Sequence, residues 1–344
     1  MRIERVHLAD LPRCYAAASM LVGGRLHYLF ASELDAPCFA FDAEDLSRHT
    51  VWEHPGGTMS IVPLRNRADE FLAVQNFKPK MMSPDTEIVR ASYRGENKWT
   101  VRTLAKLGYI HRFDVFSGSR DHLLVCTIAT RKTCLEDWSC PGKLWAGILP
   151  EDPEAQVELK PILEGLTRNH GYWRTAVNGK NAGVVASDEG VRLVFPPERD
   201  GDGWSFETLI ERPVSDIAMA DIDGDGEMEI AAIEPLHGDL FTVNKRINGS
   251  WQVVYEYPGN FKLGHVVWGG EIRGEPCFIG GSREGDGELF MLRSGKNGRT
   301  GFECTRIDSG RGPANVAVVH RKDEDIILAS NREIGEAALY RISD

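Results

Sequence analysis

The sequence offers little that would place the protein in a membrane or on a nucleic acid. No stretch approaches about 18 consecutive apolar residues, the length that a membrane-spanning helix needs, so no membrane partner is expected. The formal net charge is −11, and the Lys and Arg residues are scattered rather than grouped in blocks. Because affinity for nucleic acids comes largely from basic side chains that neutralise phosphates, a nucleic-acid partner is not expected either.

Cysteine is present, but its pattern does not indicate a disulfide framework. There are seven cysteines, an odd number, and the first residues, MRIERVHLADLPRC, contain no apolar segment typical of a signal peptide. We therefore expect reduced thiols and a cytoplasmic protein. Cys134 and Cys140 lie close enough in sequence to suggest a metal clip or a redox pair, but no further His or Cys pair follows at zinc-finger spacing, so plain thiols are favoured.

Long helical patterns are also lacking, and the most informative segment is a short acidic loop, DIDGDGEME. Alternate carboxylates supply the several oxygens that Ca²⁺ or Mg²⁺ prefers, and the glycines between them allow a tight turn. The flanking runs, SDIAMA and MEIAAIEP, are typical of β-strands, whereas an EF-hand loop would lie between helices. We predict a structural Ca²⁺ or Mg²⁺ site between two adjacent strands, formed by Asp221, Asp223, Asp225 and Glu229.

The strand–turn–strand unit around this loop recurs along the whole chain. Each copy has an apolar first strand, a polar or glycine turn, and a second strand that ends on a small residue. The copies are spaced by roughly 40–60 residues, and four short strands per unit are the signature of a β-propeller. The seven first strands are expected to begin at Tyr15, Thr58, His111, His170, Asp216, His265 and Asn315.

The outer strands predict how the ring closes. Six units have a recognisable fourth strand, whereas the last unit has none before the chain ends at Asp344. The N-terminal segment Arg2–Leu8 reads as a strand and has no other place in the repeat. We therefore predict an all-β, seven-bladed β-propeller in which the N-terminal strand completes the last blade, with residues 1–344 as one domain.

Three of the ten histidines fall at the same position of the repeat, at the start of a first strand. First strands line the central channel of a propeller, so His111, His170 and His265 are predicted to converge at the channel mouth. Imidazoles with an open position suit a divalent transition metal, Zn or Mn, and Asp216 is either a fourth ligand or a residue that orients a histidine. The alternative is a polar, water-filled channel mouth in which histidine has no function.

A second ring of polar residues is expected on the loops between second and third strands, on the same face. His237, in IEPLHGD, is a candidate general acid or base because imidazole titrates near neutrality, and Tyr172 is an alternative proton donor. Arg131 is a further catalytic candidate at this rim. The remaining candidates would bind a sugar substrate, although each is also explained by solvated loop charge: Asn315, Glu234, Lys78, Arg283 and Arg332.

On these motifs the chain resembles the FG-GAP/VCBS class of propellers, which carry calcium in the strand–DxDxDGxxE–strand unit. The IEPLHGD segment and the first strands headed by histidine look similar to the propeller part of aldos-2-ulose dehydratase. That resemblance implies a metal-dependent enzyme that eliminates water from keto sugars and isomerises the product. The family's additional cupin-type domains have no counterpart here, which leaves the isomerase activity without support. A looser resemblance is to propeller-fold polysaccharide lyases.

The sequence thus predicts a metal-dependent carbohydrate lyase or dehydratase that performs β-elimination on a keto sugar or sugar derivative at the channel mouth. A metal on the channel histidines would act as the electrophile, and His237 or Tyr172 would move the proton. The alternative is a non-catalytic propeller that binds a glycan or a protein, because fold does not fix function.

Overall fold

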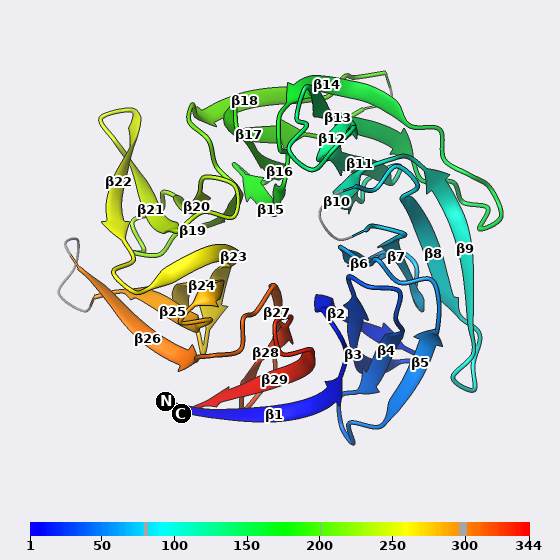
Figure 1. Ribbon diagram of the computed structural model, residues 1–344, viewed down its shortest axis with the longest axis horizontal. Helices are drawn as coiled ribbons and strands as arrows, with labels where there is room; N and C mark the ends of the chain where they lie inside the picture. The colour runs from blue at the N-terminus through cyan, green and yellow to red at the C-terminus, as the bar shows by residue number, and fades with distance from the viewer. Residues whose placement is uncertain (79–81, 200, 296–300) are drawn as a thin grey trace.

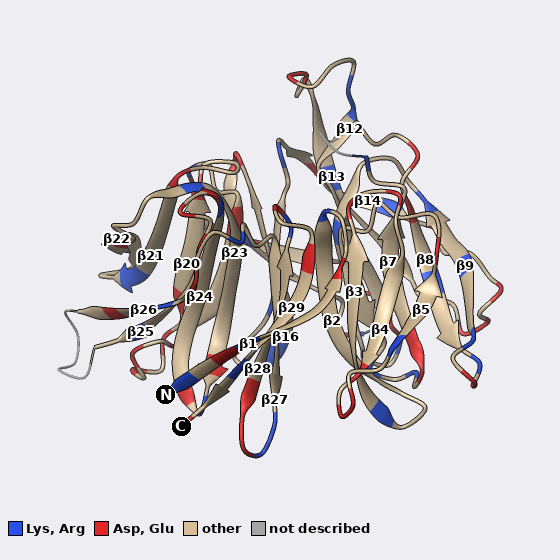
Figure 2. Cartoon of the chain, turned by 60° about the horizontal axis from the view of Figure 1, so that its bottom comes forward, with Lys and Arg blue, Asp and Glu red and all other residues tan. Residues whose placement is uncertain are grey.

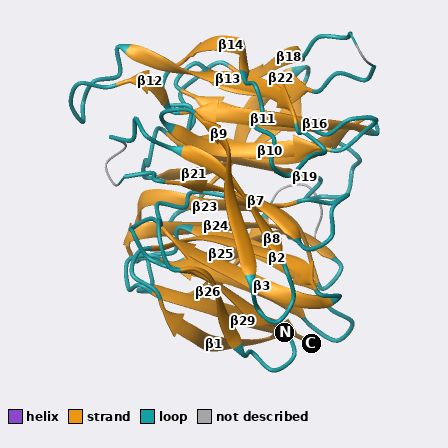
Figure 3. Ribbon diagram, turned by 90° about the vertical axis from the view of Figure 1, so that its right-hand side faces the viewer, coloured by secondary structure: helices purple, strands orange, loops and turns teal. Residues whose placement is uncertain are grey.

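The protein is an all-β ring of seven sheets around a common axis, as the repeat predicted (Figure 1). The structure, a computed structural model, describes residues 1–78, 82–199, 201–295 and 301–344. Strands and connecting loops account for these residues, with no helix among them (Figure 3). Accordingly, the described part of the chain contains no helix long and apolar enough to cross a membrane.

Each blade is a meander of antiparallel strands, and the strands of a blade are given below in order from the one nearest the axis to the outermost one. Blade 1 contains β2 (Cys14–Val22), β3 (Arg25–Ser32), β4 (Cys38–Asp42) and β5 (Arg48–Trp52). Blade 2 contains β6 (Ile61–Pro63), β7 (Glu70–Gln75), β8 (Glu87–Tyr93) and β9 (Trp99–Lys106). Blade 3 contains β10 (Ile110–Phe116), β11 (His122–Thr127), β13 (Cys140–Ile148) and β14 (Lys160–Leu166), with the short β12 (Ala129–Arg131) beside β13.

The remaining blades follow the same plan. Blade 4 contains β15 (Gly171–Val177), β16 (Lys180–Ser187), β17 (Gly190–Phe195) and β18 (Ser205–Ile210). Blade 5 contains β19 (Asp216–Ala220), β20 (Glu229–Glu234), β21 (Leu240–Ile247) and β22 (Ser250–Glu256). Blade 6 contains β23 (Phe261–Ile272), β24 (Glu275–Gly285), β25 (Leu289–Ser294) and β26 (Phe302–Asp308). Blade 7 contains β27 (Asn315–His320), β28 (Asp325–Asn331), β29 (Glu336–Ser343) and β1 (Arg2–Asp10).

The ring closes through the two ends of the chain, which confirms the predicted role of the N-terminal strand. β1 is the outermost strand of blade 7 and pairs antiparallel with β29, from Arg2 opposite Ser343 to Asp10 opposite Glu336. Both termini lie at the edge of this one blade (Figure 1). Arg5 also forms an ion pair with the buried Glu336, so charge as well as the backbone ladder holds β1 in place.

The burial pattern of the strands explains why the repeat could be predicted from the sequence. The second strands β20 and β28 are buried at every residue because each is packed between the neighbouring blades. The outermost β22 is mostly exposed, and its two half-buried residues, Trp251 and Tyr255, lie an even number of positions apart and so on the same face of the strand. The hydrophobic clusters lie mostly between adjacent blades, so no single blade has a core of its own.

Two first strands depart from the predicted starts by more than one residue. β6 begins at Ile61 rather than Thr58, because the backbone N–H of Thr58 donates to Ser32 of the preceding blade instead of joining the ladder. β23 begins at Phe261, before His265, because its pairing with β24 continues through Gly285. The segment that carries β12 projects beyond the other loops on its face (Figure 2).

Candidate metal centre

Three imidazoles at the axis are fixed in the same way. Nδ1 of His111 donates to the carbonyl of His170 (3.1 Å), Nδ1 of His170 to that of Ser215 (3.3 Å), and Nδ1 of His265 to that of Ala314 (2.7 Å). Each acceptor belongs to the next blade of the ring. A neutral imidazole that donates through Nδ1 has its lone pair on Nε2, so these bonds fix both the tautomer and the direction of the ring.

The loop between β20 and β21 brings a fourth imidazole, that of His237, to the axis. The backbone N–H of His237 donates to the Ser215 hydroxyl (3.1 Å), and its φ of 48° is left-handed. The next residue, Gly238, is tightly enclosed: a Cβ there would lie 2.1 Å from the carbonyl oxygen of Glu234. The sequence IEPLHGD therefore forms a compact turn that points this histidine inward.

His170, His237 and His265 form a cluster whose candidate ligand nitrogens all lie within 4.8 Å of one another. Nε2 of His237 is 3.1 Å from Nε2 of His170. Two nitrogens bound to a tetrahedral Zn²⁺ at about 2.0–2.1 Å lie about 3.4 Å apart, so a small shift of the rings would accommodate such an ion. The Nδ1–H bonds to carbonyls are the outer contacts that metal-binding histidines usually have. The residues present therefore fit a transition metal.

The ligand set differs from the one that the sequence predicted. His111 lies against His170, with ring centroids 4.2 Å apart, but is not one of the three clustered histidines. Asp216 does not join the cluster: its Oδ2 is 3.8 Å from Nδ1 of His170, and 3.9 Å from Arg112. Asp216 therefore lies on the Nδ1 edge of His170, beyond hydrogen-bond distance, while Nδ1 itself is bonded to the Ser215 carbonyl. The role of orienting a histidine stays a prediction.

Burial gives these histidines unusual protonation behaviour. It lowers the pKa of His111, His170 and His265 well below the ordinary 6.5, and the neighbouring positive charges and imidazoles act in the same direction. Burial, reinforced by Arg283 and two other arginines, lowers the pKa of His237 to about 3. All four rings are therefore neutral near pH 7, and a metal would not have to displace protons in order to bind.

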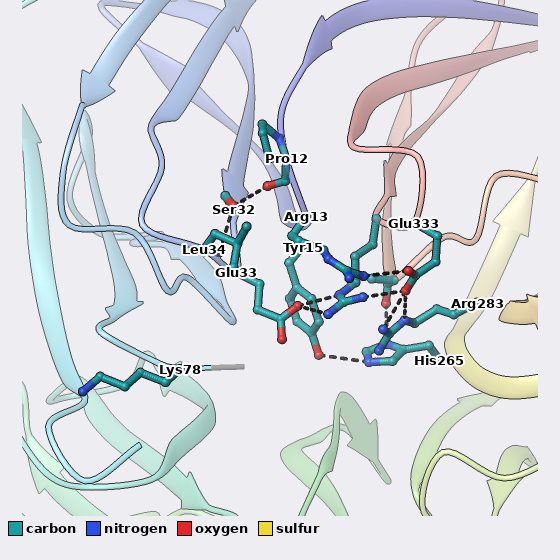
Figure 4. A network of polar contacts seen from close by, with 12 residues as sticks. Pro12, Arg13, Tyr15, Ser32, Glu33, Leu34, Lys78, His265, Arg283 and Glu333 are labelled. Atoms are coloured by element: carbon teal, nitrogen blue, oxygen red, sulfur yellow. Dashed lines mark hydrogen bonds and ion pairs between the residues drawn. The ribbon is translucent and has the colours of Figure 1, made fainter. Parts of the chain in front are cut away.

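Tyr15 is a residue at the axis, beside the cluster, that the sequence did not single out as a candidate. Its hydroxyl lies 3.1 Å from Nε2 of His265, and burial raises the pKa of Tyr15 to about 12, so it keeps its proton at neutral pH. Figure 4 shows this hydroxyl directed at His265. Tyr15 was the first residue of its strand in the repeat, so the signal was its position in the same column as the histidines.

A network of arginines and glutamates lies beside His265 of the cluster (Figure 4). Glu333 accepts from Arg13 (2.6 Å) and Arg283 (2.7 Å), and Arg332 bonds to both Glu333 and the buried Glu33. Three arginines and two glutamates give this network a net charge of +1 beside the histidines. The predicted substrate-binding residues Arg283 and Arg332 therefore do lie near the cluster, where they also fix each other through Glu333.

Three other candidates lie elsewhere. Arg131 is exposed on β12, where its backbone pairs with that of Cys140. Lys78 is also exposed, 3.8 Å from Asp85, and extends away from the arginine–glutamate network (Figure 4). Glu234 accepts two hydrogen bonds from Arg212 (2.7 and 2.9 Å), so its charge is already compensated within blade 5.

Tyr172 and Asn315 both line a cavity of about 530 Å³ that occupies the channel on the other side of the histidines. The Tyr172 hydroxyl donates to Asp114 (2.5 Å), which Arg174 also binds, so Tyr172 is not placed to protonate a ligand at the cluster. Asn315 donates to the carbonyl of Tyr15 (2.8 Å) and so continues the inter-blade bonding of the histidine ring.

Arg112 and Asp216 are the charged groups of that cavity nearest the histidines. Both are more than nine-tenths buried. Arg112 donates to the carbonyl of Met59 (2.7 Å) and approaches Asp216 no closer than 3.9 Å, so part of its hydrogen-bonding capacity faces the cavity. Burial raises the pKa of Asp216 to about 7, although Arg112 opposes the shift.

The acidic loop lies between β19 and β20, and the structure adds a residue to it that the sequence pattern did not include. Asp221, Asp223 and Asp225 offer carboxylate oxygens within 4.8 Å of one another, as expected for a cation loop. Lys245, on β21, places its ammonium 2.5 Å from Asp223 and 2.7 Å from Asp225. A cation is therefore already among the predicted ligands of Ca²⁺ or Mg²⁺.

Fold and site together define a β-propeller with a histidine cluster on its axis. No family model matches the chain, and no curated protein matches it in sequence. The FG-GAP/VCBS and aldos-2-ulose dehydratase resemblance therefore stays a prediction.

Solved structures share the fold at low sequence identity. The β-propeller domain of Cps50 (Swd1) from Myceliophteria thermophila has a TM-score of 0.62 and 9% identity, over 100% of both chains. The PQQ-bound aldose sugar dehydrogenase from Streptomyces coelicolor has a TM-score of 0.51 and 14% identity, over 100% of this chain and 99% of that one. The apo-form soluble aldose sugar dehydrogenase from Escherichia coli has a TM-score of 0.52 and 13% identity, over 99% of each chain.

Proposed function

We propose that the protein is a metal-dependent carbohydrate lyase or dehydratase that performs β-elimination on a keto sugar or sugar derivative. The observation that carries this proposal is the cluster of His170, His237 and His265, with the outward-facing nitrogens of two rings anchored to backbone carbonyls. A divalent transition metal bound there, Zn or Mn, would supply a Lewis acid for a carbonyl oxygen.

The chain's own residues supply proton transfer and substrate orientation. Tyr15 holds its proton and lies beside His265, so its hydroxyl is the group placed to donate a proton at the cluster. Arg112 and Asp216 line the cavity beside His265 and would hold hydroxyls of the substrate, whereas Arg283 and Arg332 lie on the opposite side of the histidines, outside the cavity lining. Tyr15 and Arg112 replace Tyr172 and Arg131 in the roles that the sequence assigned.

The size and lining of the axial cavity support a sugar as ligand. Its volume of about 530 Å³ is in the range of small-molecule sites. Trp268 and Trp173 contribute apolar surface and Arg112 and Asp216 contribute donors and acceptors, a combination that suits a polyhydroxylated molecule. Two of the similar structures are those of aldose sugar dehydrogenases, which makes monosaccharides the first compounds to test.

The test combines metal content with turnover. Single variants His170→Ala, His237→Ala and His265→Ala should each lose the transition metal measured by mass spectrometry, and with it the absorbance of an unsaturated product formed from keto sugars. His54→Ala, an exposed histidine paired with Asp35, is the matched control and should retain both. Full metal content and full turnover in all three cluster variants would refute the proposal.

A non-catalytic binding propeller is the second candidate, and one observation favours it. The contacts between His237 and His170 and between Tyr15 and His265, each 3.1 Å, are complete hydrogen bonds without an ion. Exhaustive chelation distinguishes the two functions: an enzyme loses a transition metal together with its activity, whereas a binding module has none to lose. Isolation of a stable glycan or protein complex that survives chelation would support the second candidate.

A further inference from the structure

The acidic loop of blade 5 is filled by a side chain that comes from another strand. Lys245 reaches from β21 into the loop between β19 and β20, and its Nζ lies 2.5 Å from Asp223, 2.7 Å from Asp225 and 2.9 Å from Glu229. An ammonium group has three N–H donors, and three carboxylates surround it. Hydrogen bonds join the ammonium to Asp223 and Asp225, the contact with Glu229 is an ion pair, and Oδ1 of Asp223 is buried without a hydrogen-bond partner.

The other carboxylate oxygens of the loop are largely engaged by the backbone. Asp221 accepts from the N–H groups of Gly224 (2.7 Å) and Gly226 (3.0 Å), and the second oxygen of Glu229 accepts from Ile222 (3.0 Å). Calcium takes about six to eight oxygens at 2.3–2.6 Å, so it would have to displace both the ammonium and some of these bonds. This donor set does not fit a divalent ion while Lys245 remains in place.

The lysine is held in this position by its surroundings. Its side chain is 23% exposed, whereas Glu229 beneath it is 1% exposed. Burial lowers the pKa of Lys245, but the three carboxylates around it outweigh this effect and raise the pKa, so the ammonium is charged at neutral pH.

We propose that the ammonium of Lys245 is the cation of this loop. It neutralises the carboxylates and stabilises the loop conformation, the role that the sequence pattern assigned to Ca²⁺ or Mg²⁺. Blade 5 would then keep its shape when divalent ions are removed. This inference is independent of the histidine cluster and of the proposed enzymatic function.

Replacing the lysine should convert the loop into a divalent-ion site. In Lys245→Gln, four carboxylates, those of Asp221, Asp223, Asp225 and Glu229, would face one another without a counter-charge. We expect a lower melting temperature in EDTA, partial recovery on adding Ca²⁺, and at least tenfold tighter Ca²⁺ binding by titration calorimetry than in the wild type. Lys180→Gln, which removes an exposed lysine paired with Glu198, is the matched control.

Two results would overturn the proposal. One is a wild-type protein that binds Ca²⁺ at micromolar concentration and melts at a higher temperature with it, with no gain in Lys245→Gln. The other comes from chemical labelling of the wild-type protein, which remains informative if Lys245→Gln fails to fold. If Lys245 occupies the loop, acetic anhydride in the presence of EDTA should label Lys245 more slowly than Lys180. Equal labelling of the two lysines would mean that Lys245 does not occupy the loop.

Discussion

Acidification of the metal-free protein is expected to destabilise it well above the pH at which carboxylates titrate. His111, His170, His237 and His265 are neutral in the folded state because burial lowers their pKa values below 6.5, whereas in the unfolded chain they titrate near 6.5. The unfolded state therefore binds more protons as the pH falls through 6.5. By linkage, the stability is fully present above that pH and is lost below it.

The magnitude follows from proton counting. For each histidine that stays neutral in the folded state, lowering the pH from about 7.5 to 5.5 reduces the free energy of unfolding by about 1.4 kcal/mol. Four such histidines reduce it by about 5.5 kcal/mol. Asp216 acts in the opposite direction. Its pKa in the folded state is raised to about 7, so it takes up a proton in the folded state over this range, which increases the free energy of unfolding by about 1.9 kcal/mol. The net loss is about 3.6 kcal/mol, a large part of the 5–15 kcal/mol typical of domains.

The assay is chemical denaturation in EDTA at pH 7.5, 6.5 and 5.5, with the free energy of unfolding extrapolated to water. His111→Gln should reduce the loss by about 1.4 kcal/mol, because one fewer buried imidazole is protonated on unfolding. His54→Gln, which removes an exposed histidine, is the control and should leave the loss unchanged. Stability that is constant or rises between pH 7.5 and 5.5 would refute the assignment of neutral, buried imidazoles.

Three further perturbations test separate parts of the molecule. Gly238→Ala places a Cβ against backbone and should displace His237, lowering the affinity for a transition metal about 10- to 100-fold by titration; unchanged affinity would contradict the loop geometry. Arg332→Met leaves Glu33 buried without its partner and should lower the free energy of unfolding, measured by chemical denaturation, by about 3–5 kcal/mol. A decrease below about 1 kcal/mol would contradict the assignment of this buried pair. Deleting residues 1–10 exposes the edge of β29 and should produce aggregates by size-exclusion chromatography, whereas a stable monomer would show that closure is dispensable.

The architecture could be predicted because it is repeated locally. A strand packed between two neighbouring blades needs apolar residues at every position, as in β20 and β28, and such runs are visible in a single sequence. The predicted first residue of a strand was less accurate where a contact with another blade decides where pairing begins. β6 is shorter than predicted because the backbone of Thr58 bonds to the preceding blade, a contact that no local sequence pattern encodes.

The candidate site was only partly predictable. Placing His170 and His265 in one column required no more than the repeat, since first strands line the axis. That His237 rather than His111 completes the cluster depends on a loop turn and on which edge of each ring faces a neighbouring carbonyl. Tyr172 was assigned to the same face as the histidines, but its bond to Asp114 places it in the channel beyond them.

By itself, the sequence determined the all-β propeller, its seven blades and the N-terminal strand that closes the ring, because each rests on hydrophobic periodicity and on the count of strands. Only the tertiary structure decided which charges and imidazoles meet. Tyr15 and His265 are 250 residues apart in the chain yet share a hydrogen bond. Lys245, on β21, enters a loop from which it is separated in sequence by β20. Such encounters are set by how blades pack around the axis, which no segment of the sequence specifies alone.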